Sequence, residues 1–173
     1  MKRIGIYGGM FDPVHNGHIY TAEKARQHTG VDLMLWAVAP QPLLKPNTPM
    51  FSLEDRKDFV IASLPSNNHD LYWHDNVFIS DTVSDILSRG MSPVLVLGTD
   101  LVHQIKEWNN YEKVLRGLEI CWVNRKGYPH KIGKFETPIR MSSTDIRNRI
   151  DNKDVLEGLV PKNVIKLINW TRE

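Results

Sequence analysis

The amino-acid sequence predicts an α/β protein in which helices cover a mostly parallel sheet, all within a single domain. Short apolar runs alternate with segments of helical periodicity, which is the pattern of repeated strand–helix units. At 173 residues, the chain has the length of one domain with a substantial core. Hydrophobic residues make up 41% of the chain and charged residues 24%, so the composition excludes a disordered or fibrous protein.

Strands are expected where the apolar runs lie, at residues 3–8, 32–40, 93–100 and 118–125. Most of these runs end in glycine, proline or a polar residue. We therefore expect functional groups at the carboxyl ends of the strands. The single cysteine, Cys121, lies inside the last run, so it is expected to be a buried core residue without a disulfide partner.

Helices are expected between and after the strands, at residues 18–28, 52–64, 80–90, 109–117 and 161–170. The second helix opens with Ser52 and Asp55 in a Ser-x-x-Asp capping pattern, and Gly90 is expected to end the third. Segments 39–51 and 63–77 contain prolines and are expected to be long loops. Such loops are either binding loops and lids or mobile surface segments.

The distribution of charge and hydrophobicity gives little support for a nucleic-acid or membrane partner. The formal net charge is +2, and the chain contains no long block of like charges. Its first apolar run is interrupted by glycine, and no apolar stretch is long enough to span a bilayer. We therefore expect a cytoplasmic protein without nucleic-acid or membrane partners, and its oligomeric state stays open, a homo-oligomer included.

The stretch YGGMFDPVHNGH, residues 7–18, has the composition of a phosphate-binding turn. Gly8 and Gly9 directly follow a predicted strand, and a helix is expected to begin near residues 16–18. A turn without Cβ atoms there lets backbone N–H groups and a helix N-terminus face a bound anion. The stretch is neither a Walker A loop nor a Gly-x-Gly-x-x-Gly dinucleotide fingerprint.

Two histidines in this stretch, His15 and His18, are three positions apart, so on a helix they share one face and can contact the same ligand. We favour the interpretation that they donate hydrogen bonds to a phosphate. A zinc site is one alternative, although it needs further ligands such as Asp12 or Cys121, and the chain has no second paired-ligand motif. A purely structural pair, which caps the helix and packs, is the other alternative.

A second polar cluster occurs in RMSSTDIRNRI, near the carboxyl-terminal end of the chain. Ser142 and Asp145 form another capping pattern, with Ser143 and Thr144 in the first turn and Arg147 just behind. Hydroxyls, free N–H groups and a guanidinium therefore converge at one helix N-terminus, which suits a polyphosphate. Serine-rich caps followed by arginine also occur in helices without a ligand.

Together, these two stretches resemble the motifs of the HxGH nucleotidylyltransferases, which move a nucleoside monophosphate group from a nucleoside triphosphate. GGMFDPVHNGH is similar to their Gly-Gly-x-Phe-Asp-Pro-x-His-x-Gly-His motif, and MSSTDIR is similar to their Ser-Ser-Thr-x-Ile-Arg motif. Within that superfamily, the chain most resembles the nicotinate mononucleotide adenylyltransferases of NAD biosynthesis. Two further segments, APQPLLKP and VLGTDLVHQIKEWNNYEKVLRGLEICWVNRKGYP, are similar to parts of that family.

The resemblance covers about residues 3–150 and implies a Rossmann-like, doubly wound sheet with helices on both faces, followed by a helical segment at about 142–173. It implies transfer of AMP from ATP, with Mg²⁺ as cofactor, to nicotinate or nicotinamide mononucleotide. The resemblance also implies that His15, His18, Lys45 and Arg147 make the catalytic contacts. The residues expected to bind ATP are Gly8, Gly9, Met10, Phe11, His15, His18, Gly98, Asp100, Ser142, Ser143, Thr144 and Arg147.

The pyridine mononucleotide is expected, on the same resemblance, to bind Lys45, Ser80, Asp81, Thr82, Trp108 and Arg125. Trp108 is the expected stacking platform for the pyridine ring. The family usually has Ser-Tyr-Thr where this chain has Ser-Asp-Thr at 80–82. If Asp81 faces the ring, its charge disfavours nicotinate and favours the amide of nicotinamide.

Two other functions stay open. Another HxGH transferase would join ATP or CTP to pantetheine phosphate or an alcohol phosphate, and the segment around Trp108 argues against it. A non-catalytic nucleotide sensor would keep the phosphate site without the chemistry. The presence of both histidines, Lys45 and Arg147 argues against a sensor.

Overall fold

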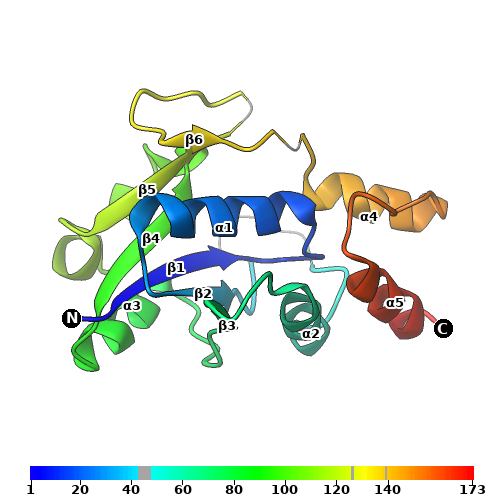
Figure 1. Ribbon diagram of the computed structural model, residues 1–173, viewed down its shortest axis with the longest axis horizontal. Helices are drawn as coiled ribbons and strands as arrows, with labels where there is room; N and C mark the ends of the chain where they lie inside the picture. The colour runs from blue at the N-terminus through cyan, green and yellow to red at the C-terminus, as the bar shows by residue number, and fades with distance from the viewer. Residues whose placement is uncertain (43–47, 126, 139) are drawn as a thin grey trace.

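The structure is a computed structural model of the chain, and it describes all residues except 43–47, 126 and 139. Its strands and helices alternate along most of the chain (Figure 1). In chain order they are β1 Arg3–Gly9, α1 Asn16–Thr29, β2 Leu33–Val38, α2 Leu53–Ser63, β3 His69–Leu71, α3 Ile79–Ser88, β4 Ser92–Gly98, β5 Glu119–Asn124, β6 Phe135–Glu136, α4 Ser143–Asn152 and α5 Lys162–Thr171. Three short helical turns, η1 Thr99–Leu101, η2 Ile105–Glu107 and η3 Tyr111–Leu115, connect β4 to β5.

Within the described residues, the strands form one six-stranded sheet in the order β3-β2-β1-β4-β5-β6, and each pair of neighbours is parallel. The chain runs from β1 outwards to β2 and β3, and then returns to place β4 on the other side of β1. This reversal next to β1 is the topological switch point, where open α/β sheets bind ligands. The fold is therefore the expected doubly wound, Rossmann-like one.

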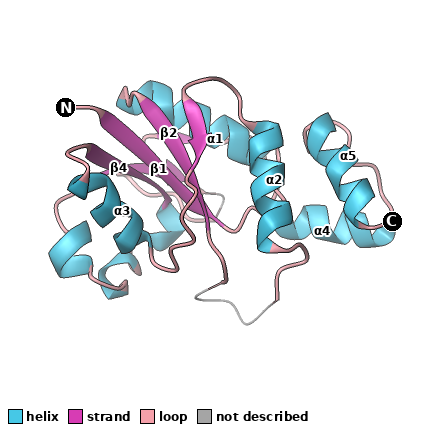
Figure 2. Ribbon diagram, turned by 90° about the horizontal axis from the view of Figure 1, so that it is seen from below, coloured by secondary structure: helices cyan, strands magenta, loops and turns pink. Residues whose placement is uncertain are grey.

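Apolar side chains cover both faces of the sheet. Along β4, Val94 and Val96 face one core while Leu95 and Leu97 face the other, as the alternation of side chains in a strand requires. The first core lies against α1, α2, α4 and α5, and the second lies against α3 and the η segments. Figures 1 and 2 show α1 and α3 on opposite faces, with α4 and α5 beyond the carboxyl ends of the strands.

The four predicted strands are confirmed as β1, β2, β4 and β5, but two short edge strands were not predicted. β3 lies inside the segment 63–77, so the expectation of a continuous loop there is wrong. β3 has three residues and β6 has two, which is too short for an apolar pattern to emerge from the sequence. Cys121 is buried as expected.

The short helix expected at 109–117 is present as the π-helical segment η3, which is shorter than the expected range. It lies between Asn110 in the left-handed conformation, with φ 56°, and Gly117, with φ 82°. Among the described residues, no helix has the length and hydrophobicity needed to cross a membrane.

Candidate active site

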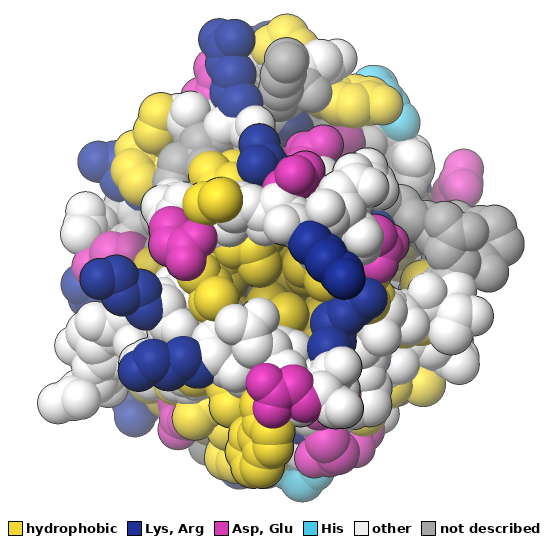
Figure 3. All heavy atoms as spheres, turned by 90° about the vertical axis from the view of Figure 1, so that its right-hand side faces the viewer, with side chains coloured by type: hydrophobic (Ala, Val, Ile, Leu, Met, Phe, Trp, Pro, Cys, Tyr) yellow, Lys and Arg dark blue, Asp and Glu magenta, His cyan; other side chains and the backbone are white. Residues whose placement is uncertain are grey.

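A cavity of about 970 Å³ opens at the carboxyl ends of β1, β4 and β5, between the N-termini of α1 and α4. Figure 3 looks onto this end of the molecule and shows a hollow with an apolar floor and basic side chains at its edge. The cavity brings together every residue predicted to bind ATP: Gly8, Gly9, Met10, Phe11, His15, His18, Gly98, Asp100, Ser142, Ser143, Thr144 and Arg147.

His15 and His18 form a capping box at the start of α1, with their rings stacked at a centroid separation of 3.8 Å. The Gly17 backbone N–H donates to His15 Nδ1 over 3.1 Å, and the His15 backbone N–H donates to His18 Nδ1 over 3.1 Å. Capping boxes usually use a hydroxyl and a carboxylate or carboxamide for these two roles. Here two imidazoles perform them, so the helix start and the candidate phosphate donors are the same residues.

These hydrogen bonds determine where each imidazole carries its proton. Because each Nδ1 accepts from a backbone N–H, the proton of the neutral ring must lie on Nε2. Burial lowers the pKa of His15 to about 4, and burial together with the neighbouring His15 lowers the pKa of His18 well below its usual value. At neutral pH the pair therefore presents two uncharged Nε2–H donors, both from residues that line the cavity.

The first turn of α1 differs from the expectation that its backbone would bind the anion. The Asn16 N–H donates to the Leu159 carbonyl, the Gly17 N–H to His15 Nδ1 and the His18 N–H to the His15 carbonyl. The expectation is therefore wrong for these three N–H groups of the helix, because acceptors within the protein already use them, while the part that concerns the glycine turn stays a prediction. Anion binding at α1 must therefore come from the imidazole Nε2–H groups and the helix dipole.

The first turn of α4, unlike that of α1, has backbone N–H groups that are not used by acceptors in the described part of the protein. Ser142 and Asp145 cap the helix reciprocally, as predicted, at 2.9 Å and 3.2 Å. Among the described residues, no acceptor faces the backbone N–H groups of Ser143 and Thr144. Arg147 donates from Nη1 to the Asp12 carbonyl over 2.7 Å and from Nη2 to Thr144 Oγ1 over 3.0 Å. This helix end therefore provides open N–H donors and a guanidinium beside each other.

Asp100 and Arg125 face each other across the end of β4. Arg125 Nε lies 3.6 Å from Asp100 Oδ1, which is buried and has no hydrogen-bond partner in the described part of the chain. A Cβ atom at Gly98 would collide with both side chains, so the glycine makes their approach possible. Oδ1 of Asp100 therefore has an unused acceptor position, in a residue that lines the first cavity.

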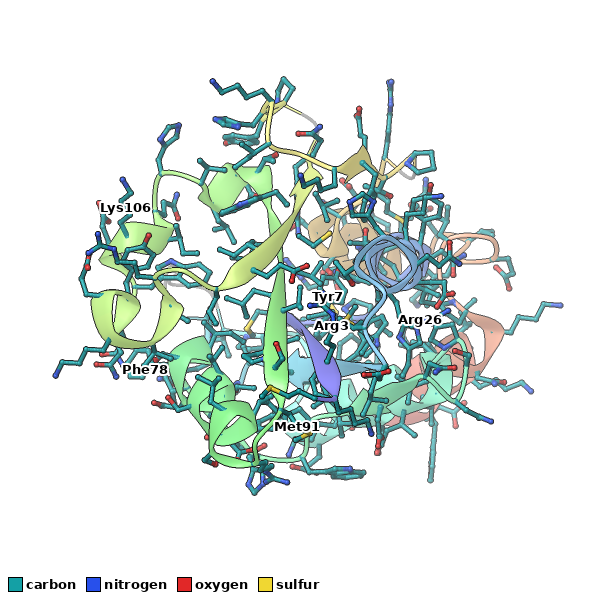
Figure 4. All side chains as sticks on the ribbon, turned by 60° about the vertical axis from the view of Figure 1, so that its left-hand side comes forward. Arg3, Tyr7, Arg26, Phe78, Met91 and Lys106 are labelled. Atoms are coloured by element: carbon teal, nitrogen blue, oxygen red, sulfur yellow. The ribbon has the colours of Figure 1, made fainter. Side chains whose placement is uncertain are left out.

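A second cavity, of about 400 Å³ and with a mainly apolar lining, adjoins the first across Gly8, Gly9 and Leu97. Three of the residues predicted for the pyridine, Ser80, Thr82 and Trp108, line it. Figure 4 shows Phe78, which borders this cavity, and Lys106 of η2 on the same side of the molecule, while Tyr7 lies inside beside α1. The two adjoining cavities provide separate binding places side by side, as a reaction between two nucleotides requires.

Two residues predicted for the pyridine lie elsewhere. Asp81 is exposed and lines neither cavity, because α3 turns Ser80, Thr82 and Val83 inward and leaves position 81 on the outer side. The condition under which its charge would favour the amide is therefore not met. Arg125 lines the first cavity and not the second, so it lies among the residues predicted to bind ATP. Lys45 lies outside the described residues.

Asp12 and Arg56 are not among the residues that the sequence patterns predict for the site. The buried carboxylate of Asp12 accepts the backbone N–H groups of Met50 and Phe51 over 2.8 Å and 2.9 Å. The guanidinium of Arg56 is completely buried in α2. The sequence contains a signal that Arg56 is buried. Arg56 lies three residues before Phe59 and four before Val60, so it shares the inward, apolar face of its helix.

The depressed pKa values of the two histidines predict a loss of stability in mild acid. The unfolded chain titrates each imidazole near 6.5, whereas the folded protein keeps His15 neutral down to about pH 4. The unfolded state therefore binds more protons in this interval, and the free energy of unfolding falls as the pH drops from about 6.5 to about 4, by a few kcal/mol.

Urea unfolding at a series of pH values measures this fall. The variant His15→Asn keeps an N-cap acceptor but does not titrate, so its free energy of unfolding should fall less steeply in the same interval. A slope equal to that of the wild type would contradict the assignment of the fall to His15.

Comparisons with known proteins agree with this geometry. The sequence model of the cytidylyltransferase-like family matches residues 6–149. The chain is 30% identical to the nicotinate-nucleotide adenylyltransferase of Bacillus subtilis, over 97% of this chain and 96% of that protein. It is 27% identical to a probable nicotinate-nucleotide adenylyltransferase of Clostridium botulinum, over 97% and 96%. The fold matches that of the Plasmodium falciparum nicotinic acid mononucleotide adenylyltransferase complexed with NaAD, with a TM-score of 0.78, 17% identity and coverage of 99% and 97%.

Proposed function

Because this chain belongs to the cytidylyltransferase-like family, and within it to the nicotinate-nucleotide adenylyltransferases, it is a nucleotidyltransferase, and we propose that it joins ATP to nicotinate mononucleotide. The products are the dinucleotide and pyrophosphate, in a step of NAD biosynthesis that we expect to take place in the cytoplasm. The observation that carries the proposal is that His15 and His18, whose Nδ1 atoms accept backbone N–H groups and leave Nε2–H as the donor, line the same cavity as the open N-terminus of α4.

The reaction needs placement and charge stabilisation more than proton transfer. An oxygen of the mononucleotide phosphate attacks the α-phosphorus of ATP, while the bond from this phosphorus to the oxygen that bridges to the β-phosphorus breaks. The attacking oxygen is already anionic at neutral pH, so no general base is required. The imidazoles, held neutral by burial, cannot serve as strong acids, and they act instead as fixed hydrogen-bond donors.

Each donor group is assigned to one part of the triphosphate. His15 and His18 donate to the α- and β-phosphates, where charge builds as the bond breaks. The N–H groups of Ser143 and Thr144, with Arg147, hold the β- and γ-phosphates, and Asp100 accepts from a ribose hydroxyl of ATP. We further assign Lys45 to the phosphate of the mononucleotide.

The donor set of the first cavity fits a cation that arrives with ATP better than one held in a protein cage. Among the described residues, no group of three or more His, Cys, Asp or Glu side chains is placed to hold a metal ion, and the carboxylates of Asp12 and Asp145 at the cavity already accept backbone N–H groups. Mg²⁺ would therefore be held by the phosphates and by water, and when bound it neutralises charge on the departing pyrophosphate.

The second cavity favours the acid over the amide of the pyridine substrate. α3 begins at its edge, and among the described residues no acceptor faces the backbone N–H groups of Ile79 and Ser80. Such a helix start stabilises a carboxylate more than a neutral amide. Glu107 is the acidic residue that lines this cavity, and it is exposed to water, where screening weakens its repulsion.

Pyrophosphate release from ATP and Mg²⁺ tests both parts of this proposal. We expect release only when a pyridine mononucleotide is added, with kcat/KM at least about tenfold higher for the acid than for the amide, since tenfold corresponds to about 1.4 kcal/mol. Reactions without acceptor, and with pantetheine phosphate as acceptor, are the controls. A preference for the amide would contradict the role of α3, and release with pantetheine phosphate alone would contradict the proposed acceptor.

A further inference from the structure

Two adjacent cationic residues of α2, Arg56 and Lys57, are buried, with exposed fractions of 1% and 7%. Burying a charge is costly unless it is paired or fully hydrogen-bonded, so each of them requires partners. The two side chains find these partners in different segments of the chain. Figure 2 shows α2 close to the end of the sheet where the strands stop.

Arg56 is held by backbone carbonyls rather than by a carboxylate. Nη1 donates to Met10 over 2.8 Å and to Ala39 over 2.7 Å, Nη2 donates to Pro40 over 3.1 Å, and Nε donates to Phe51 over 3.2 Å. One planar group thus joins the chain just after β1, just after β2 and just before α2.

These carbonyls belong to segments that line both cavities. Met10 lines the first cavity, as do Thr48, Pro49 and Met50, which directly precede Phe51, and Ala39 lines the second. The carboxylate of Asp12 fixes the same corner from the other side, through the backbone N–H groups of Met50 and Phe51. The position of both walls at this corner therefore depends on Arg56.

Lys57 reaches a different segment. Its Nζ lies 2.6 Å from Asp75 Oδ1 and 3.3 Å from Glu54 Oε1. Asp75 lies between β3 and α3, and its neighbours His74, Asn76, Val77 and Phe78 line the second cavity. The ion pair with Asp75 thus ties the wall of that cavity to α2.

We propose that Arg56 and Lys57 are positioning residues of different reach: Arg56 positions the walls for both substrates, and Lys57 positions only the wall of the second cavity, for the mononucleotide. This division of roles, with ATP in the first cavity and the mononucleotide in the second, rests on the proposed function. Neither residue touches the reacting atoms: Arg56 acts through the backbone of Met10, Ala39 and Phe51, and Lys57 acts through Asp75.

Steady-state kinetics of two variants test the division. Arg56→Lys keeps the charge but cannot reach four carbonyls, so the KM for ATP and the KM for the mononucleotide should both rise, each on the order of 10- to 100-fold. Lys57→Met removes the ion pair and keeps the length of the side chain, so the KM for the mononucleotide should rise about tenfold while the KM for ATP stays within about threefold. Asp75→Asn should reproduce the second result.

The control is Arg116→Met, which removes an exposed ion pair with Glu112 at a residue that lines neither cavity, and should change neither KM. If Arg56→Lys does not fold, Arg56→Gln replaces it. Equal changes in both KM values in Lys57→Met would overturn the proposal, because general destabilisation does not distinguish the substrates.

Amide hydrogen exchange of the substrate-free protein gives a readout that does not depend on the reaction. Arg56→Lys should accelerate exchange at residues 10–12 and 48–51, and Lys57→Met should accelerate it at residues 72–78. If the wild type transfers no adenylyl group but this pattern holds, the proposed function fails while the division of roles stands. If both variants accelerate the same segments, the division itself is wrong.

Discussion

Replacing His18 by glutamine should reduce kcat by about 10²- to 10³-fold while leaving the folded structure intact, because this is the usual loss when one donor to a developing charge is removed. Glutamine is a common residue at this position of a capping box, so it can still accept from the His15 backbone N–H. When its Oε1 accepts this bond, the amide N–H bonds of glutamine point in other directions than the imidazole Nε2–H, so the donor at the cavity is lost. The expected KM for ATP is close to that of the wild type, since the lost contact strengthens mainly in the transition state.

Turnover assays and thermal unfolding of the same preparations check this expectation. His28→Gln is the matched control, because it makes the same change at an exposed position of the same helix, outside both cavities. A fall in the unfolding temperature as large as that caused by deleting the cap would show that His18 serves the helix rather than the reaction. Equal losses in kcat and in ATP affinity would show that it binds the ground state.

In the proposed reaction, the two helix N-termini at the first cavity hold different parts of the triphosphate. α1 has its first three N–H groups satisfied within the protein, so its contribution comes from two imidazoles held rigidly by the capping box. α4 keeps two N–H groups open and adds Arg147. Fixed, uncharged donors suit the reacting phosphate, because they need no reorganisation as charge develops, whereas the open helix end and the guanidinium suit the phosphates that carry the most charge.

Much of this site could be predicted because its residues lie in two contiguous motifs with strong local constraints. The spacing of His15 and His18 predicts their shared face, and Ser142 with Asp145 predicts the start of α4, since capping depends on neighbours in sequence. The strands of the sheet interior were predictable for a similar reason, because long apolar runs are needed where both faces are covered.

The remaining features depend on contacts between distant parts of the chain. The acceptor of the Asn16 N–H is Leu159, and no local pattern could indicate that this N–H is unavailable to a ligand. The side of α3 on which Asp81 lies depends on how the helix packs against β4, and the four carbonyls around Arg56 come from three segments. Tertiary packing decides these features, and the spacing of residues within one motif does not.

Gly98→Ala should reduce kcat/KM for ATP on the order of 100-fold, because the added methyl group occupies space that Asp100 and Arg125 share at the end of β4. One of these side chains must move, and either movement removes a proposed ATP contact, the acceptor oxygen of Asp100 or the cation of Arg125. Because the methyl group meets side-chain atoms rather than backbone, we expect the loss in kcat/KM for ATP rather than in stability.

Gly5→Ala provides the matched control in the neighbouring strand β1. Its methyl group would meet mainly the flexible end of Met34, which can turn away, so this variant should lose some stability and keep its kcat/KM for ATP. ATP binding and urea unfolding should be measured for both variants. A loss of ATP binding reports a steric effect at the nucleotide site, and a loss of stability reports a steric effect in the core. If Gly98→Ala binds ATP as the wild type does, Asp100 and Arg125 do not contact the nucleotide, and the assignment of the Asp100 acceptor to a ribose hydroxyl must be abandoned.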